Sequence, residues 1–171
     1  IQINRIQQEI LDGLMLGDGH ISFNNVSGRY SQGCKHEEFL THVRATLPFK
    51  WSPLWFDKKN SCYHLKSRYT PSLHEFKEKW YPEGKKRVPP DLKLTSNVLL
   101  YWYLSDGCLT FGNKKKFPNS KSYRVVISTD GFIKEDNLLL LSRLRDLQIE
   151  ASLLKNNRIR IKAESNQKFF E

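Results

Sequence analysis

The sequence predicts an α+β protein built from two similar halves. Segments with helical periodicity alternate with pairs of short β-prone runs, in the order helix, hairpin, helix, hairpin, helix. This order occurs once, is followed by a stretch rich in proline and lysine, and then begins again. The aspartates of two Asp-Gly pairs, Asp18 and Asp106, lie 88 positions apart (106 − 18), close to half of the 171 residues. We therefore expect an internal duplication of architecture without obvious identity of residues.

Composition restricts the class of protein further. The 39% hydrophobic and 12% aromatic content excludes a disordered chain. The net charge of +10 and the pI near 9.6 indicate an anionic partner, nucleic acid first and an acidic membrane surface second. The longest apolar run, residues 98–104, is far shorter than the roughly 20 residues of a membrane span. Three cysteines and the lack of a signal-like start favour an intracellular, reducing compartment and no role in a membrane.

The first half opens with a helix and a hairpin. Residues 5–16 carry apolar side chains at helical spacing and lead into a Gly-Asp-Gly triplet. Two runs with strand character follow at 21–24 and 29–33, joined by residues that favour turns. An amphipathic pattern then predicts a second helix over 37–47, closed by Pro48.

A second hairpin and a third helix complete this half. Residues 54–57 and 62–68 are expected to pair through a turn. Ser72 begins the third helix as a capping box with Glu75, because each side chain could bond the backbone N–H near the other. After this helix, proline, glycine and a Lys85-Lys86-Arg87 run interrupt the periodicity and indicate a linker.

The second half repeats the order, with Thr95, Ser96 and Asn97 able to cap its first helix. We expect an N-terminal half over residues 1–84, a linker over 85–94 and a C-terminal half over 95–171. The expected elements of the second half are a helix over 98–105, strands at 109–111 and 122–129, a helix over 135–147, strands at 151–154 and 158–162, and a last helix cut short at residue 171.

Asp18 and Asp106 differ from the other two Asp-Gly aspartates, Asp12 and Asp130. An Asp-Gly pair is usually a turn former, and Asp130 fits that interpretation because it follows a strand-like run. Asp18 and Asp106 each end a helix, where a carboxylate faces the negative end of the helix dipole and needs a compensating cation. The pattern alone is compatible with two interpretations. The aspartates either form a shared metal site at a pseudo-twofold axis or belong to two ordinary turns.

The first helix also carries Gly13 and Gly17, four positions apart. Their spacing leaves one helix face without side chains and allows a partner helix to approach closely. A glycine inside a helix costs about 1 kcal/mol relative to alanine, so close packing of the two Asp-Gly helices explains them better than chance composition.

Two of these segments resemble the motif of the LAGLIDADG homing endonuclease family. Residues 11–19, LDGLMLGDG, are similar to the nine-residue motif, and residues 99–107, LLYWYLSDG, are similar to its second copy. The segments YSQGCKH (30–36), KRVP (86–89) and VIST (126–129) fit the monomeric, double-motif, intron-encoded type. Leu16 replaces the first aspartate of the motif, and Tyr101 stands where the motif has glycine, so asymmetric helix packing is expected.

The resemblance implies two αββαββα units that pack through the two motif helices, each with a saddle-shaped antiparallel sheet along the DNA major groove. It implies a site-specific endonuclease that makes a staggered double-strand break in a long target by Mg²⁺-dependent phosphodiester hydrolysis. Two or three divalent ions are implied, with Mn²⁺ able to substitute and Ca²⁺ able to bind without supporting cleavage. The implied partner is double-stranded DNA, bound by a monomer, and the RNA of a host intron is a second candidate partner. The implied location is the cytoplasm of a prokaryote or an organelle of a eukaryote.

The resemblance also implies site residues. Asp18 and Asp106 would be the metal-binding carboxylates, with the carbonyls of Gly17 and Ser105 nearby. This agrees with the preference of Mg²⁺ for few carboxylates, several waters and phosphate oxygens. Gln32 and Lys86 match polar catalytic residues that in the family order water and stabilise developing charge, whereas a solvated linker lysine is the alternative for Lys86.

Basic and polar residues of the hairpins are the candidate DNA-binding surface. In residues 158–162, the alternation of cations and isoleucines would put the cations on one face of a strand. Arginine and lysine can read guanine, asparagine can read adenine, and lysines in turns suit phosphates, although any one lysine can equally be a solvated charge. Ser128 is included as a second-half counterpart of Gln32. The candidates are Asn24, Asn25, Arg29, Lys35, Lys58, Lys59, His64, Lys66, Arg68, Lys114, Lys115, Lys116, Lys121, Arg124, Ser128, Asn156, Arg158, Arg160 and Lys162.

Other functions remain open. An RNA maturase or a DNA-binding regulator on the same scaffold is the main alternative, but retention of both aspartates favours catalysis, since a binding protein gains nothing from carboxylates beside phosphates. A generic RNA-binding domain would show an RNA-recognition or KH signature, and none is recognisable. The pairs Cys34-x-His36 and Cys62-x-His64 suggest zinc, but their spacing differs from that of structural zinc sites, which favours coincidence.

Overall fold

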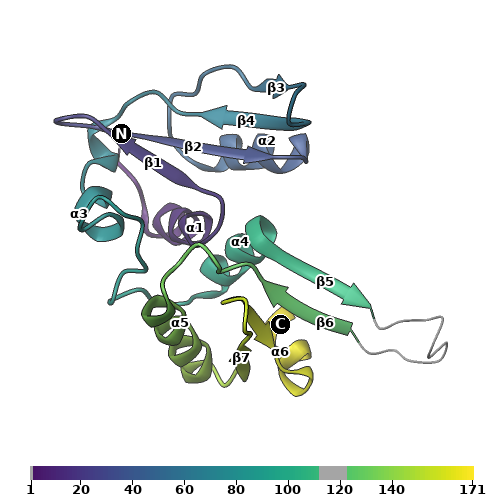
Figure 1. Ribbon diagram of the computed structural model, residues 1–171. Coiled ribbons are helices and arrows are strands. Elements are labelled where there is room, and N and C mark those ends of the chain that lie inside the picture. Colours follow the sequence, from purple (N-terminus) through teal and green to yellow (C-terminus); the bar gives the residue numbers. More distant parts are fainter. Residues whose placement is uncertain (1, 112–122) are drawn as a thin grey trace.

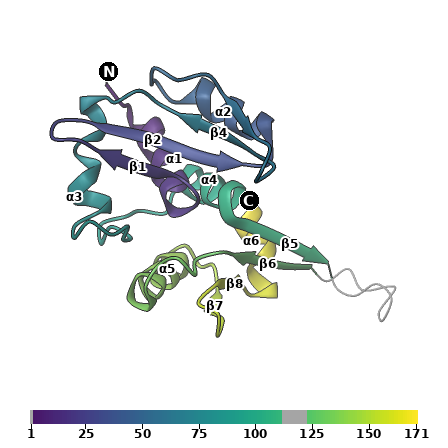
Figure 2. The same cartoon turned by 45° about the horizontal axis from the view of Figure 1, so that its top comes forward.

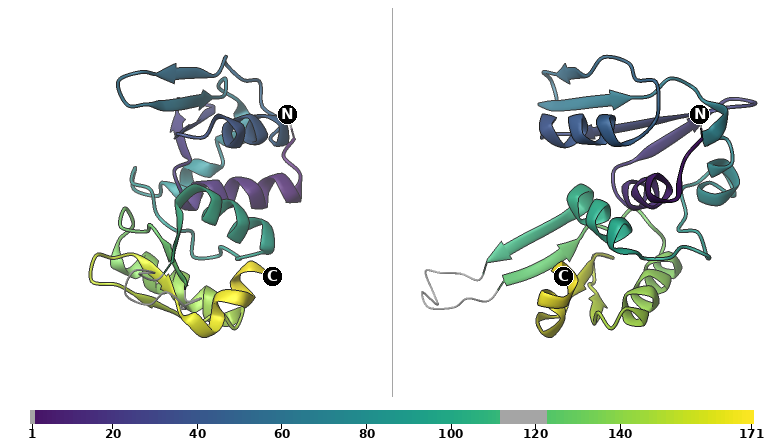
Figure 3. Two further views of the ribbon diagram at one scale, coloured as in Figure 1. Left: turned by 90° about the vertical axis from the view of Figure 1, so that its right-hand side faces the viewer. Right: turned by 180° about the vertical axis from the view of Figure 1, so that it is seen from behind.

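Two halves meet at a central pair of helices in the computed structural model, which describes residues 2–111 and 123–171. Helix α1 (Arg5–Leu16) belongs to the first half and α4 (Ser96–Asp106) to the second, and the two lie side by side (Figure 3, left). One four-stranded sheet lies on each side of this pair (Figures 1 and 2). The predicted α+β class and the internal duplication are therefore confirmed. None of the described helices is long and apolar enough to cross a membrane.

The first half follows the predicted order of elements. Its sheet is antiparallel with the strand order β1-β2-β4-β3, so the two hairpins join through β2 and β4. Helix α1 begins at a capping box, in which the side chains of Asn4 and Gln7 each bond the backbone N–H of the other. This capping box was not predicted from the sequence. The elements after α1 are β1 (His20–Phe23), β2 (Gly28–Cys34), α2 (Glu37–Thr46), β3 (Trp55–Asp57), β4 (Cys62–Lys66), the 3₁₀ turn η1 (Pro71–Leu73) and α3 (Phe76–Trp80).

The second half repeats this topology. Its antiparallel strand order is β5-β6-β8-β7, the same arrangement with every strand number raised by four. Thr95 caps α4 by accepting a hydrogen bond from the backbone N–H of Val98. The elements after α4 are β5 (Gly107–Phe111), β6 (Tyr123–Ile127), α5 (Lys134–Asp146), β7 (Ala151–Leu153), β8 (Ile159–Ile161), the 3₁₀ turn η2 (Ala163–Ser165) and α6 (Asn166–Phe170).

The predicted start of the third helix is wrong. Ser72 lies inside η1, and its hydroxyl is 3.2 Å from the Thr70 hydroxyl instead of capping a helix. The α-helix starts only at Phe76, and the side chain of Glu75 makes no capping bond. Pro71 at the first position of η1 explains the difference, because its fixed φ starts a tight turn one residue before the expected cap.

Each sheet has one buried and one open face. On β2 and β4, Tyr30, Gln32 and Leu65 are buried against the helices. Ser31 and Lys66, which follow Tyr30 and Leu65 on these strands, pair with each other and lie on the opposite face. This period of two carries over to the second sheet, where Ile159 and Ile161 are buried and Arg160 between them is exposed.

The glycines of α1 allow the two central helices to touch. A Cβ atom at Gly13 would lie 2.6 Å from the carbonyl oxygen of Val98 and 2.9 Å from Cβ of Tyr101. A Cβ atom at Gly17 would overlap Cβ of Ser105. The expected close packing is confirmed, and so is its asymmetry: the side chain of Tyr101 reaches His42 on α2, 2.7 Å from hydroxyl to Nε2, with the rings stacked.

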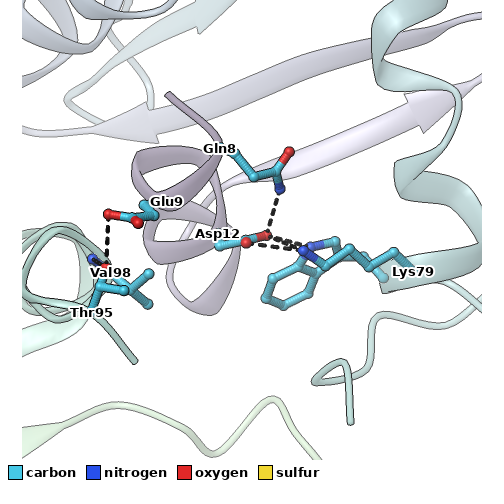
Figure 4. Close-up of polar contacts among 7 residues, drawn as sticks. Gln8, Glu9, Asp12, Lys79, Thr95 and Val98 are labelled. Atoms are coloured by element: carbon cyan, nitrogen blue, oxygen red, sulfur yellow. Dashed lines mark hydrogen bonds and ion pairs between the residues drawn. The ribbon is translucent and has the colours of Figure 1, made fainter. Parts of the chain in front are cut away.

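Asp12, the first Asp-Gly aspartate, is a structural residue. It is buried at the side of α1 and accepts hydrogen bonds from Lys79 Nζ at 3.0 Å and from Trp80 Nε1 at 3.1 Å (Figure 4). One turn earlier, Glu9 accepts bonds from the side chains of Thr95 and Asn97 at the start of α4. These two carboxylates fasten α3 and α4 to α1.

Replacement of Asp12 by alanine should lower the free energy of unfolding by about 3 kcal/mol, because it leaves the Lys79 ammonium without its partner and the buried Trp80 N–H without an acceptor. Urea unfolding measures this loss. The control is Asp146→Ala, which removes an exposed partner of Arg143 at 3.7 Å and should cost less than about 0.5 kcal/mol. Equal losses in the two variants would show that Asp12 is not a fastening point.

Candidate active site

The C-terminal ends of the two central helices meet at one cavity. Helix α1 is followed by Gly17 and Asp18, and α4 ends at Asp106. Both aspartates line a cavity of about 290 Å³, together with Lys86 from the linker and Ser128 from the C-terminal half. The structure thus brings together the two carboxylates that occupy equivalent positions in the duplicated chain.

Glycine packing positions these carboxylates. Gly17 lies against Ser105, and a Cβ atom at Gly17 would also come within 3.5 Å of Asp106 Oδ2. Since Gly17 directly precedes Asp18 and Ser105 directly precedes Asp106, the missing side chain lets both chain segments approach one another. The geometry of the cavity therefore follows from the same small-residue contact that holds the two halves together.

The two carboxylates lie in an environment that disfavours their negative charge. Burial raises the pKa of Asp106 to about 7, and the nearby charge of Asp18 adds to the shift. Burial also raises the pKa of Asp18, the more exposed of the two, while the Lys86 ammonium opposes that shift. A divalent cation between the carboxylates would remove both penalties.

Lys86 points into this cavity from the linker. Its Nζ donates hydrogen bonds to the carbonyl oxygens of Gly17 and Gly19, both at 2.7 Å, and so holds the backbone on either side of Asp18. Burial lowers the pKa of Lys86 to about 8, and the two aspartates limit the shift. The neighbouring Arg87 anchors the linker through a two-point ion pair with Asp136 on α5. Lys86 is therefore placed at the candidate site and is not a solvated linker lysine.

Gln32 is not among the described residues that line the cavity. It is buried on β2, where its Oε1 accepts a hydrogen bond from the Tyr30 hydroxyl. Its Nε2 donates to the Ser105 hydroxyl at 3.3 Å, across the boundary between the halves. Both ends of the amide are thus bonded within the protein, which gives Gln32 a positioning role for the end of α4.

Replacement of Gln32 by alanine should lower the free energy of unfolding by about 1 to 3 kcal/mol, because the fully buried Tyr30 hydroxyl loses its acceptor. Chemical denaturation checks the value. Ser31→Ala, one residue earlier and on the open face of the same strand, is the matched control and should change stability by less than about 0.5 kcal/mol. A Gln32 variant as stable as the Ser31 variant would rule out the positioning role.

The expected correspondence between Ser128 and Gln32 is wrong by one residue. His20, two residues after Asp18, pairs with Ser31. Cys108, two residues after Asp106, pairs with Val126. Counting on from these pairs, Ile127 occupies the place of Gln32, and Ser128 occupies the place of Gly33. A buried aliphatic side chain therefore stands in the second half where the first half has the amide.

Asp130 belongs to the site, although the sequence indicated only a turn. It lines the cavity and its Oδ1 accepts a hydrogen bond from Arg158 Nε at 2.8 Å, which lowers the pKa of Asp130. Arg158, expected to bind DNA, also lines the cavity and is ion-paired there. No periodicity in the sequence signals this pair, because the two residues come from separate loops that meet only in the folded half.

The candidate DNA-binding residues of the first half fall into three groups. Arg29, His64 and Lys66 project from the open face of the first sheet, as the register with Ser31 requires. Asn24 is exposed, but its Oδ1 is engaged within its own turn, where it accepts hydrogen bonds from the backbone N–H groups of Val26 and Ser27. The remaining candidates lie in exposed turns or strand ends: Asn25, Lys35, Lys58, Lys59 and Arg68.

In the second half, Arg124 and Arg160 lie on the open face of the second sheet. Lys162, two residues after Arg160, lies on the same face, and its Nζ is 3.5 Å from Oε2 of Glu150. Asn156 is exposed in the turn between β7 and β8. The candidates Lys114, Lys115, Lys116 and Lys121 lie outside the described residues.

The donors at the cavity suit a cation that keeps most of its own water. Mg²⁺ is usually held by one or two carboxylates and completes its shell with water and phosphate oxygens. Asp18 and Asp106 supply two carboxylates, and Gly17 also lines the cavity, whereas Ser105 is not among its described lining residues. Within residues 2–111 and 123–171 there is no group of three or more His, Cys, Asp or Glu side chains that could hold a metal by itself. The site therefore fits Mg²⁺ in contact with a substrate phosphate better than an all-protein metal centre.

Comparison with known sequences identifies relatives along most of the chain. The model of the LAGLIDADG DNA endonuclease family matches residues 8–169. A protein of Wickerhamomyces canadensis, named as a probable intron-encoded endonuclease, is 30% identical over 167 residues, which cover 88% of this chain and 68% of that protein. An uncharacterised protein of Methanocaldococcus jannaschii is 29% identical over 149 residues, covering 79% of this chain. The matched part spans about half, 54%, of that archaeal protein.

Solved structures share the fold. The homing endonuclease I-WcaI bound to its DNA recognition sequence aligns with a TM-score of 0.79 at 21% identity, covering 99% of this chain and 80% of that one. The N-terminal LAGLIDADG domain of WhiA aligns with a TM-score of 0.55 at 14% identity, covering 99% and 83% of the two chains. The chain, with its two motif helices and duplicated sheets, belongs to the LAGLIDADG DNA endonuclease family.

Proposed function

We propose that this protein is a site-specific homing endonuclease that hydrolyses one phosphodiester bond in each strand of a long duplex target. The observation that carries the proposal is the convergence of Asp18 and Asp106 in one cavity at the ends of the paired helices. The W. canadensis relative is named as an intron-encoded endonuclease, and the I-WcaI structure contains a DNA recognition sequence, which supports duplex DNA as the substrate.

The proposed cofactor is Mg²⁺, as two or three ions held by Asp18 and Asp106 and by the carbonyls of Gly17 and Ser105, with Mn²⁺ as a substitute and Ca²⁺ as a non-catalytic ligand. When bound, it would supply a nucleophilic water and stabilise the leaving oxygen. The chain contributes the rest: Lys86 fixes the backbone around Asp18 and places a positive charge near the reacting phosphates. Each half presents one carboxylate from the end of its central helix, so each half is proposed to act on one strand, and the break is proposed to be staggered.

The two open sheet faces are the proposed DNA-binding surface. They carry Arg29, Lys66, Arg124 and Arg160 in a chain with a net charge of +10, which favours a polyanion. Both motif helices come from one chain and bury their glycine contact against each other, which supports action as a monomer with halves 1–84 and 95–171 joined by a linker at 85–94. An intracellular location, cytoplasmic or organellar according to the host, goes with this proposal.

The proposal is tested by incubating a large duplex library with the protein and Mg²⁺ and sequencing the ends that are produced. Recurrent breaks within one long sequence, absent when EDTA replaces Mg²⁺, are the expected result. Capture of one duplex sequence without breaks would identify a DNA-binding regulator instead. Selective binding of an intron RNA with no affinity for duplex DNA would identify an RNA maturase; either outcome would overturn the proposed nuclease.

Lys86→Met should reduce the cleavage rate by at least about 10²-fold while leaving affinity for the target within about threefold, because charge beside the reacting phosphate matters most in the transition state. Rates are measured on the recovered target with enzyme in excess. Lys85→Met is the matched control, since Lys85 is the exposed neighbour in the same linker and makes the same change in net charge. Equal rates for the two variants would remove Lys86 from the site.

A further inference from the structure

An aromatic side chain stands on the open face of the first sheet. Trp55, on the edge strand β3, leaves 46% of its surface exposed. Its indole stacks on the imidazole of His64, with ring centroids 4.4 Å apart and ring planes inclined by 14°. Lys66 Nζ lies 5.8 Å from the indole centroid, so a cation borders the same ring. The open face thus presents the flat apolar surface of the indole ring, supported by His64, beside the positive charge of Lys66.

Strand register aligns the indole of Trp55 with Asp18, the candidate catalytic residue of the first half. Trp55 pairs with His64, and His64 pairs with Gly33 on β2. Counting on from the pair His20–Ser31, Gly33 faces the position of Asp18. A Cβ atom at Gly33 would lie 3.2 Å from His64 Cε1, so the glycine provides the room in which the imidazole lies flat across the sheet. Continued two residues past its last pair, the register of β1 on β2 thus leads this row toward Asp18, which lies in the turn before β1.

The second half lacks this feature at the equivalent positions. Ser128 occupies the place of Gly33, as the register of β6 shows. Continuing across the second sheet, Arg158 takes the place of His64, and Leu154, whose N–H bonds the Arg158 carbonyl at 2.8 Å, takes the place of Trp55. The same strand order therefore forms in the second half without an aromatic row. The aromatic row is thus free to serve recognition by one half alone.

We propose that Trp55, held by His64, is a specificity-determining residue that contacts a thymine methyl group in the part of the target bound by the N-terminal half. This inference rests on the proposed function. In the major groove the C5 methyl of thymine is the apolar feature that distinguishes it from the other bases, and an exposed indole face matches it. Lys66, at the border of the indole, supplies a cation for a phosphate or a base edge next to that thymine.

Phe56 provides a matched control. It is the next residue of β3, is 47% exposed, and packs against Tyr63 with ring centroids 4.7 Å apart and planes inclined by 50°, but it points to the opposite face of the sheet. Trp55→Ala and Phe56→Ala therefore remove aromatic surface of similar exposure from the same edge strand. Only the first removes it from the face that carries the proposed DNA contacts.

The test selects bound duplexes from a library with the unmodified protein and with both variants, using Ca²⁺ so that binding is read without cleavage. The unmodified protein and Phe56→Ala should prefer thymine at one or two adjacent positions, and Trp55→Ala should lose that preference by about fivefold or more. Replacing those thymines by uracil should weaken binding of the unmodified protein about threefold, the effect of one buried methyl group, and should not affect Trp55→Ala.

An unchanged base profile for Trp55→Ala, or the same loss of preference in Phe56→Ala, would overturn the assignment while leaving the nuclease proposal intact. Selection of no duplex by the unmodified protein would overturn both. A uracil effect of equal size in the unmodified protein and Trp55→Ala would show that the methyl group is read by another residue.

Discussion

Asp18→Asn and Asp106→Asn are each expected to reduce double-strand cleavage by at least about 10³-fold while leaving affinity for the target unchanged. Both carboxylates line the same cavity, and each is the acidic group that its half contributes from the end of a central helix. Asparagine keeps the shape of aspartate but removes the charge that would hold a divalent ion. Rates on each labelled strand and binding isotherms in Ca²⁺ measure the two quantities separately.

Stability gives the control for these variants. Burial raises the pKa of both carboxyls, and the charge of Asp18 adds to the shift at Asp106, so removing one charge should leave the metal-free protein at least as stable as before. Loss of cleavage with an undiminished thermal midpoint then reports on chemistry and not on folding. Full cleavage of both strands by either variant would show that this pair is not the catalytic centre.

Gly13→Ala is expected to have a large effect on folding, a loss of about 2 to 4 kcal/mol in the free energy of unfolding. In an open helix this change would stabilise by about 1 kcal/mol, so the sign of the effect reports on packing. The new methyl group would lie 2.6 Å from the carbonyl oxygen of Val98, and backbone of the partner helix cannot move aside as a side chain can. Equilibrium unfolding in urea measures the loss.

Two further variants separate the effect of helix packing from the general effect of replacing glycine by alanine. Gly131→Ala adds a methyl group at a position with no atom within 4 Å and should leave stability unchanged within about 0.5 kcal/mol. Gly17→Ala should destabilise because its Cβ overlaps Cβ of Ser105, and the added change Ser105→Gly should restore about 1 kcal/mol or more. Stabilisation by Gly13→Ala, or no rescue by Ser105→Gly, would contradict the close helix contact.

The sequence predicted most of the fold because its signals were local. The helix at Arg5–Leu16 has the predicted bounds, since apolar spacing and a terminal glycine both mark its ends. Gly13 and Gly17 indicated a close helix contact, and their missing side chains lie in it. The duplication left the meeting of Asp18 and Asp106 open and the family resemblance implied it; the two carboxylates do line one cavity.

The features that escaped prediction depend on contacts between distant segments. Asp130 and Arg158 meet only after two loops of the second half fold together, so Asp130 looked like an ordinary turn residue. Register across β6 is set by strand pairing, so the sequence alone does not show that Ser128 is equivalent to Gly33 and not to Gln32. The stack of Trp55 on His64 likewise needs the register of β3 on β4. In each case the sequence gives the residue type but not its neighbour.

The central claim, that the two halves together hold divalent ions at Asp18 and Asp106, is tested most directly by anomalous diffraction from crystals of the protein bound to its recovered target with Mn²⁺. The account predicts anomalous peaks in the cavity of about 290 Å³, bonded to both carboxylates and to the phosphates at the two breaks. Mn²⁺ bound only at other positions, with both aspartates free of metal while the DNA is cut, would contradict it.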